Sequence, residues 1–328
     1  MQTGQSFSIN TNKAVLDACA RFFLEMLARV FEKHNRSQEI IYHYTNSTAF
    51  HSIVNTDSLH ATHISFMNDR AEYQHAVDML IETAEIRRKT NLTAPQIRIV
   101  DALLDDLKAA SPENYHPIFI ASFSRDSNEL NQWRAYGGGG ASFNLGLKIS
   151  HLRELIVEQQ KTQSVLGYVT PVVYDSASKA DLVERVLDFI VQSYPIHEQQ
   201  HSKNDKAHVT NHRAFADNWI RDFSPFAALL APIIKNENFK QENEWRVILY
   251  PRDLSLVKFK PKLSLLAPYF PLNLKHTFEG FDDPIRHIVV GPGHYEDINH
   301  GAATAFIQLR RRKMPVIDRS KILIRDVN

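Results

Sequence analysis

Residues 118–149 read Ile118-Phe-Ile-Ala-Ser-Phe-Ser124, then Arg125 to Tyr136, then Gly137-Gly-Gly-Gly140, then Ala141-Ser-Phe-Asn-Leu-Gly-Leu-Lys-Ile149. An apolar, β-rich run is followed by a segment with helical spacing, four glycines and a second β-rich run. This order predicts a strand, a short helix, a tight turn and a strand. Because side chains alternate along a strand, Ser122 and Ser124 share one face and Phe123 takes the other.

Two aromatic residues follow the serines in the short helix. Trp133 and Tyr136 are three positions apart, so on a helix they project together and offer two stacking surfaces beside the serines. The alternative is a core helix that ends at a glycine C-cap. The sequence leaves both interpretations open.

Composition is that of an ordinary folded protein. Of 328 residues, 43% are hydrophobic and 23% are charged, and the 38 basic and 37 acidic residues give a net charge of +1. The chain therefore lacks the large net positive charge that is typical of a nucleic-acid binder.

The single cysteine, Cys19, excludes an internal disulfide and a multi-cysteine zinc site. We find no targeting signal and no apolar run near the ~20 residues of a spanning helix, so we expect a cytoplasmic protein.

The remaining chain alternates helical and β-like patterns without regular βαβ units. An amphipathic helix lies between residues 11 and 35, strands are expected at 40–45, 164–174, 241–250 and 285–290, and helices around 179–200 and 213–231. We predict an α+β fold in a single domain over residues 1–328, with residues 1–38 as a helical extension packed on it.

Polar residues on apolar strands are the candidates for chemistry. His43 lies within Tyr42-His-Tyr-Thr45, where its ring can bond a ligand hydroxyl or be a satisfied core histidine. Glu242 and Glu244 would share one strand face by alternation. Such a pair can bond a ribose hydroxyl and stabilise a developing cation, or it can be a solvated strand start paired with Arg246 or Lys240.

The order of these patterns resembles a widespread bacterial domain-of-unknown-function family. The resemblance extends from residue 40 to 325 and rests on Tyr-His-Tyr-Thr, Phe-Met-Asn-Asp69 with Glu72, Ser-Phe-Ser followed by Trp133 and Tyr136, Glu-Asn-Glu-Trp-Arg, Val-Val-Gly-Pro292 and Ser320 to Arg325.

The chain is also remotely similar to the ADP-ribosyltransferase superfamily. That resemblance rests on a histidine in an early strand, Ser-x-Ser in a middle strand and Glu-x-Glu at a late strand. It implies a split antiparallel sheet that holds NAD, with catalytic roles for Glu244, for Glu242, which would position the acceptor, and for His43. It also implies NAD contacts from a set of strand and helix residues: His43, Tyr44, Thr45, Ser122, Ser124, Trp133 and Tyr136.

The resemblance implies an enzyme that uses NAD as a substrate and moves ADP-ribose to a nucleic acid, a protein or water, as a toxin or defence effector. By charge, Glu244 should matter most for activity, and Glu244→Gln should cost little stability. Two alternatives stay open. One is a non-catalytic nucleotide- or partner-binding module of a defence or stress system, and the other is a metal-dependent nuclease built on Asp69, Glu72, Glu242 and Glu244.

Overall fold

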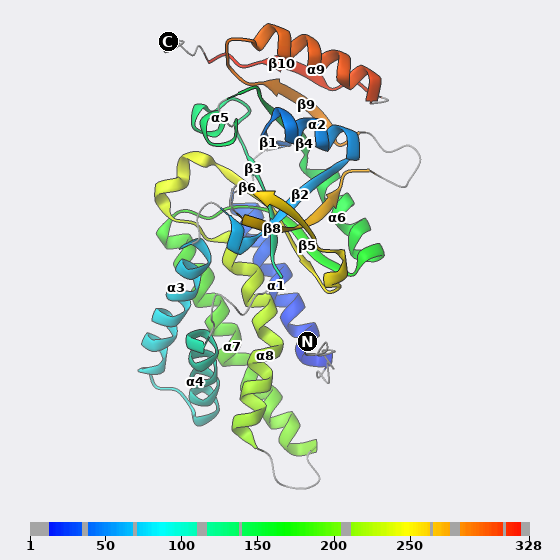
Figure 1. Cartoon of the computed structure of the whole chain (residues 1–328). Helices are drawn as coiled ribbons and strands as arrows, with labels where there is room; N and C mark the ends of the chain where they lie inside the picture. Colours follow the sequence, from blue (N-terminus) through cyan, green and yellow to red (C-terminus); the bar gives the residue numbers. More distant parts are fainter. Residues whose placement is uncertain are drawn as a thin grey trace. The chain divides into compact units, whose positions relative to one another are not determined.

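The structure is a computed structural model that describes residues 13–34, 39–67, 71–109, 117–137, 140–204, 211–262, 265–275, 283–310 and 313–322. The chain divides into two compact units (Figure 1). The helical unit comprises Met1–Arg29, Tyr73–His116 and Asp175–Ala231, and the sheet unit comprises Val30–Glu72, Pro117–Tyr174 and Pro232–Asn328. Whether the chain behaves as the single domain that its sequence predicts stays a prediction.

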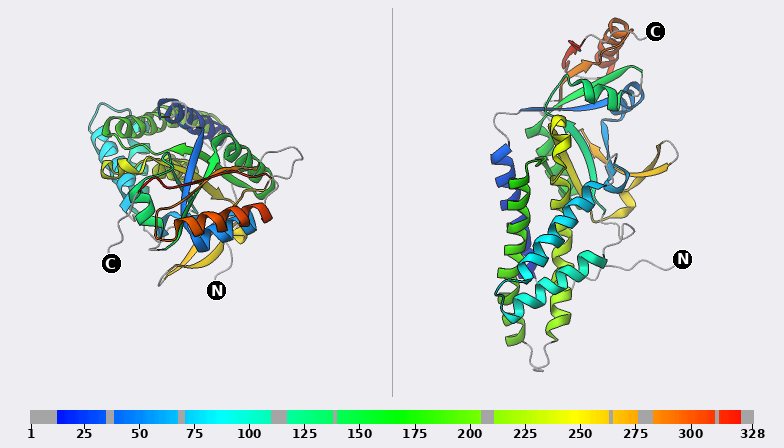
Figure 2. Two further views of the ribbon diagram at one scale, coloured as in Figure 1. Left: turned by 90° about the horizontal axis from the view of Figure 1, so that it is seen from above. Right: turned by 90° about the vertical axis from the view of Figure 1, so that its left-hand side faces the viewer.

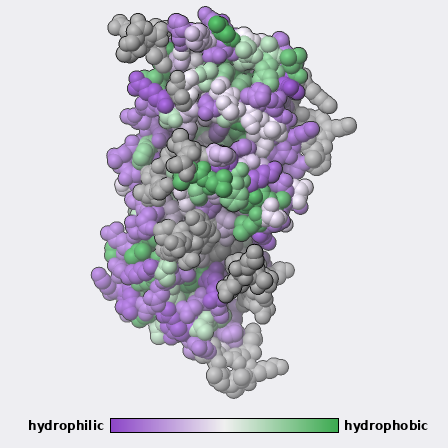
Figure 3. All heavy atoms as spheres, viewed as in Figure 1, coloured by the Kyte–Doolittle hydropathy of each residue, from purple (hydrophilic) through white to green (hydrophobic). Residues whose placement is uncertain are grey.

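The helical unit is built from five long helices in the described part of the chain: α1 (Lys13–His34, as far as Arg29), α3 (Ala71–Arg88, from Tyr73 on), α4 (Ala94–Ala109), α7 (Ser176–Asn204) and α8 (His212–Leu230). Aliphatic and aromatic side chains share its core, where the buried rings of Trp219 and Phe223 stack with centroids 5.6 Å apart. In the described residues no helix combines the length and the apolar character that crossing a bilayer requires. On the face shown in Figure 3, hydrophobic atoms gather in patches among larger hydrophilic areas.

The sheet unit contains a ten-stranded sheet in its described residues. The strands are β1 (Ile40–Asn46), β2 (Ser58–His63), β3 (Phe119–Ser124), β4 (Ser142–Lys148), β5 (Val165–Pro171), β6 (Glu244–Pro251), β7 (Lys258–Lys262), β8 (Leu265–Asn273), β9 (Ile285–Val290) and β10 (Val316–Arg319). They run in the order β10-β9-β4-β1-β3-β2-β8-β7, with β6 pairing β3 and β5. Every pair is antiparallel except β9 with β10.

Four helices and four short 3₁₀ turns complete the described part of the sheet unit. The helices are α2 (Ser47–Thr56), α5 (Leu130–Tyr136), α6 (Ile149–Gln163) and α9 (Glu296–Arg310), and the turns are η1 (Ile64–Phe66), η2 (Ala231–Ile233, from Pro232 on), η3 (Glu237–Glu242) and η4 (Leu254–Leu256). Apolar residues of α2, α6 and α9 share one core with inward side chains of β1, β3, β4 and β6. Figure 2 shows α9 beside α2, which it contacts.

One edge of β3 is shared by two strands. β1 pairs with β3 at Tyr42 and Ser124, whereas β2 pairs with β3 at Ile120 and Phe119. The register leaves Ala121, Ser122 and Phe123 without a ladder partner on that edge, while β6 pairs with the whole of β3 on the other edge. The sheet therefore opens between β1 and β2, and α2 connects the two diverging strands.

The structure confirms the coarse prediction of mixed helices and strands around a large, open, mostly antiparallel sheet. Residues 118–149 form β3, α5 and β4 in the predicted order. The register opposes Ser122 to Arg246, Phe123 to Trp245 and Ser124 to Glu244. The serines thus share a face that is opposite the apolar core containing Phe123.

Candidate functional site

A cavity of about 560 Å³ lies where β1 and β2 leave β3, within the sheet unit. Its lining includes most of the residues that the sequence singled out: His43, Tyr44, Thr45, Ser122, Ser124, Tyr136, Glu242 and Glu244. These side chains are supplied by β1, β3, the end of α5, the end of η3 and the start of β6. The branching of the sheet is therefore what brings distant parts of the sequence to one site.

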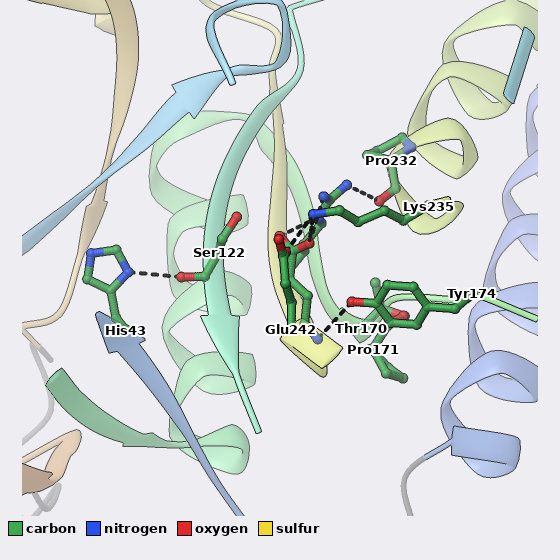
Figure 4. Close-up of polar contacts among 10 residues, drawn as sticks. His43, Ser122, Thr170, Pro171, Tyr174, Pro232, Lys235 and Glu242 are labelled. Atoms are coloured by element: carbon green, nitrogen blue, oxygen red, sulfur yellow. Dashed lines mark hydrogen bonds and ion pairs between the residues drawn. The ribbon is translucent and has the colours of Figure 1, made fainter. Parts of the chain in front are cut away.

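His43 occupies the opening between the diverging strands. Its Nδ1 lies 2.9 Å from the backbone oxygen of Ser122, the carbonyl that no strand pairs on that edge (Figure 4). Burial lowers the pKa of His43, against the effect of this hydrogen bond, so the ring is neutral at pH 7. Because a carbonyl can only accept, Nδ1 carries the proton and Nε2 is left as an acceptor.

The two serines have different surroundings. Ser124 Oγ donates to the backbone oxygen of Glu242 at 2.9 Å and accepts from the backbone N–H of Asp126 at 3.1 Å, so its hydroxyl ties β3 to the residues before β6. Ser122 Oγ is buried and has no hydrogen-bond partner among the described residues. Burying a hydroxyl without a hydrogen-bond partner costs free energy. Ser122 is therefore the serine whose hydroxyl can bond a ligand.

The two carboxylates meet through a turn and not through strand alternation. Glu242 ends η3, Glu244 begins β6, and Asn243 between them has the left-handed φ of 42°. Lys235 Nζ donates to Glu242 Oε2 at 2.7 Å and to Glu244 Oε2 at 2.8 Å. The prediction that the pair lies on one strand face is therefore wrong, because Glu242 precedes the strand and a lysine gathers both carboxylates (Figure 4).

Glu244 is held by two cations. Arg246 donates from Nε and from an Nη to its two oxygens, each at 2.8 Å, and the other Nη of Arg246 donates to the backbone oxygen of Pro232 at 2.7 Å. Burial alone would raise the pKa of the Glu244 carboxyl, but the charges of Arg246 and Lys235 outweigh it and lower the pKa to about 2. Glu244 is therefore ionised and has both oxygens engaged.

Glu242 differs from Glu244 in exposure. The Glu242 side chain is 28% exposed, whereas that of Glu244 is 6% exposed. Tyr136 lines the same cavity, and burial together with the negative charges of Glu244 and Glu242 raises the pKa of its hydroxyl to about 12. Glu242 is thus the carboxylate that a ligand in the cavity can reach.

The two aromatic residues of α5 are separated by the structure. Trp133 is buried against Tyr44, with ring centroids 4.6 Å apart, and its Nε1 donates to Asn128 at 3.0 Å. The hydroxyl of Tyr44 donates to the backbone oxygen of Asp126 and accepts the backbone N–H of Glu129. Tyr136 lines the cavity, and Trp133 is not among the described residues that do so. Trp133 is therefore placed as a core residue, so it offers no stacking surface there.

Sequence reasoning missed the second cation. It proposed Arg246 or Lys240 as partner of the carboxylates, and the structure has Arg246 together with Lys235. The signal that could have found Lys235 is a lysine directly after the apolar run Ala231-Pro-Ile-Ile234, where burial demands an acidic partner. Tyr174 was also missed, although its hydroxyl accepts the backbone N–H of Glu244 at 3.0 Å.

The described residues contain no group of three or more His, Cys, Asp or Glu side chains that could hold a metal ion. Of the proposed nuclease residues, Asp69 and the side chain of Glu72 lie outside the described residues. Glu242 and Glu244 are held by Lys235.

Fold and cavity together define a class of protein: helices and strands are mixed around an open, mostly antiparallel sheet, and a cavity that contains ion pairs lies where β1 and β2 leave β3. A family model described as protein of unknown function (DUF2971) matches residues 132–247. The match runs from α5 to β6 and includes both carboxylates and Lys235. It confirms the predicted domain-of-unknown-function family over this segment. Comparison with curated proteins and with solved structures finds no match.

Proposed function

We propose that the protein is an NAD-using, ADP-ribosyltransferase-like enzyme that moves ADP-ribose to a nucleic acid, a protein or water. The observation that carries the proposal is the convergence of His43, Ser122, Tyr136 and Glu242 on one cavity at the split of the sheet. A cavity of about 560 Å³ has the size of a small-molecule site. The biological setting that we propose is that of a toxin or defence effector.

The chemistry needs a carboxylate near the reacting ribose. When nicotinamide leaves, positive charge develops on the ribose, and a fixed negative charge stabilises the transition state more than the ground state. Both oxygens of Glu244 are bonded to Arg246 and Lys235, which offset its charge. The resemblance gives the catalytic role to Glu244; because both cations hold that carboxylate, we propose instead that Glu242 is catalytic and that Glu244 positions Lys235 and through it Glu242.

The other residues bind and orient the substrate in this proposal. The acceptor nitrogen Nε2 of His43 takes a hydrogen bond from a ribose hydroxyl, because Nδ1 is already engaged with Ser122. The Ser122 hydroxyl gains the partner that it lacks. Tyr136 supplies a ring beside Glu242 on which a base can stack.

The test is nicotinamide release from NAD by the full chain, with and without nucleic acid or cell lysate as acceptor. We expect Glu242→Gln to lower turnover by about 100-fold or more, as removal of other electrostatic stabilisers does. The matched control is Glu237→Gln, which changes an exposed carboxylate of the same turn η3 and should behave like the parent. Turnover in Glu242→Gln equal to that of the parent would refute the assignment of Glu242.

A second candidate is a non-catalytic nucleotide-binding module. The observation in its favour is that Lys235 contacts both carboxylates, so their charge is partly compensated before any ligand binds. Such a site can bind a nucleotide without promoting its cleavage. ADP-ribose binding by a parent protein that never releases nicotinamide from NAD would favour this candidate.

A further inference from the structure

A second group of polar side chains lines the cavity on strands β2 and β7. Along β2, Ser58, His60 and Thr62 are partly buried and line the cavity, whereas the residues between them are fully buried. Lys260 of β7 is also in the lining. None of these residues belongs to the carboxylate cluster described above.

Tyr269 of β8 connects the two strands. The His60 ring stacks on the Tyr269 ring with centroids 3.9 Å apart, and Lys260 Nζ lies 5.6 Å from the centroid of the same ring. The imidazole and the ammonium group therefore sit around one aromatic ring at the cavity wall.

The charge in this part of the cavity comes from Lys260. Burial, then the charges of Lys260 and Lys258, then His43, lower the pKa of His60 to about 4, so His60 is neutral at pH 7. Lys260 is the one lysine or arginine among the described residues of the lining. The carboxylates of Glu242 and Glu244 lie on other elements of the same cavity and are paired with Lys235 and Arg246, so the cavity has an ion-paired cluster at the start of β6 and a positive charge at β7.

Two buried hydroxyls in this cavity lack a hydrogen-bond partner among the described residues, Ser58 Oγ and Ser122 Oγ. Ser58 begins β2, a strand that leaves β3 at the cavity, and Ser122 is central in β3 itself. A ligand with hydrogen-bonding oxygens would satisfy both, which removes the cost of burying them unpaired.

We propose that Lys260, His60 and Ser58 form a phosphate subsite, so that a nucleotide with a diphosphate binds with its phosphates at β2 and β7 and a ribose at Glu242. This inference rests on the proposed nucleotide site and adds the position of the phosphates. Charge and hydrogen bonding set the orientation: the ammonium group of Lys260 attracts a phosphate, whereas the carboxylates of Glu242 and Glu244 are already paired with Lys235 and Arg246 and can only accept hydrogen bonds, as a phosphate does. Ser58 donates its hydroxyl proton to a phosphate oxygen, and neutral His60 donates its ring N–H.

The test is calorimetric binding of ADP-ribose and of adenosine, which lacks phosphate, to the full chain. We expect Lys260→Gln to weaken ADP-ribose binding by about tenfold or more, the effect of a lost hydrogen bond to a charged group, and to leave adenosine binding unchanged. Lys258→Gln is the matched control, since Lys258 is an exposed lysine of the same strand outside the lining. Ser58→Ala removes one hydroxyl and should weaken ADP-ribose binding by about threefold.

Three results would overturn the subsite: a parent that does not bind ADP-ribose, a parent that binds adenosine as tightly, or equal losses in Lys260→Gln and Lys258→Gln. The subsite and the enzymatic proposal fail separately. Lys260-dependent binding of ADP-ribose without nicotinamide release from NAD supports the subsite and refutes the enzyme. NAD turnover with an unchanged KM in Lys260→Gln refutes the subsite alone.

Discussion

At the residue scale, the ion pairs of Glu244 have consequences for stability. Glu244→Gln removes the negative charge opposite Arg246, which is fully buried, and opposite Lys235. Removing one partner of a buried ion pair costs about 3–5 kcal/mol, so we expect a loss of that size in the free energy of unfolding. This differs from the sequence expectation of little loss, because the sequence did not show that the carboxylate is buried. Urea denaturation monitored by circular dichroism measures it.

The control for this substitution is Glu242→Gln. Its side chain is more exposed than that of Glu244, and solvent screens its ion pair with Lys235, so its removal should cost about 1 kcal/mol or less. Equal losses in the two variants would show that burial of Glu244 does not govern the energetics.

Glu244 also predicts how stability depends on pH. The folded state lowers its pKa from 4.5 to about 2, so its ionised form stabilises the fold above pH 4.5 and this contribution is lost as pH falls towards 2. We expect the stability difference between parent and Glu244→Gln to shrink between about pH 5 and pH 2. Urea midpoints at several pH values across that window measure it, and a constant difference would contradict the assignment.

At the element scale, the packing of Trp133 of α5 beside Val289 of β9 depends on Gly291, which follows β9. A Cβ at this position would overlap Ser142 Oγ and lie 2.8 Å from Trp133 Cε3. Gly291→Ala should therefore displace Trp133 and cost about 1–3 kcal/mol, as overpacking does. Gly293→Ala is the control, because no atom lies within 4 Å of its added Cβ. Urea midpoints of the two variants decide, and equal midpoints would contradict this packing.

The opening of the sheet is also a property of elements. β1 and β2 follow one another through α2 and both run antiparallel to β3 on the same edge. They cannot both pair with the centre of β3, so no backbone N–H of β1 or β2 bonds the carbonyl of Ser122 there. The ring of His43 bonds this carbonyl instead. The cavity follows from this competition for one strand edge.

At the scale of the whole molecule, the chain alternates between its two units, so neither is a continuous stretch of sequence. Residues 205–210, between α7 and α8, lie outside the described residues. A single protease cut there should leave the two fragments associated, because Tyr194 of α7 bonds the backbone oxygen of His212 and Trp219 of α8 bonds His197. Size-exclusion chromatography of the cut protein tests this, and release of a stable fragment would contradict the predicted single domain.

The sequence by itself determined the local elements of this protein. The strand, helix and strand of residues 118–149 follow from periodicity and glycine placement, and the shared face of Ser122 and Ser124 follows from alternation. The sequence also predicted Arg246 as a partner of the carboxylates, because Arg246 is two residues from Glu244 on the same strand. Such features depend on neighbours along the chain, where steric rules act directly.

The tertiary structure alone decided which distant groups meet. It brought Lys235 to Glu242 and Glu244, turned Trp133 into the core, and placed Lys260 in the lining with His43 and Glu242. These outcomes depend on how ten strands compete for edges and on which charges are buried together. Burial and long-range pairing are set by the whole fold, and therefore the site emerges only when the sheet is assembled.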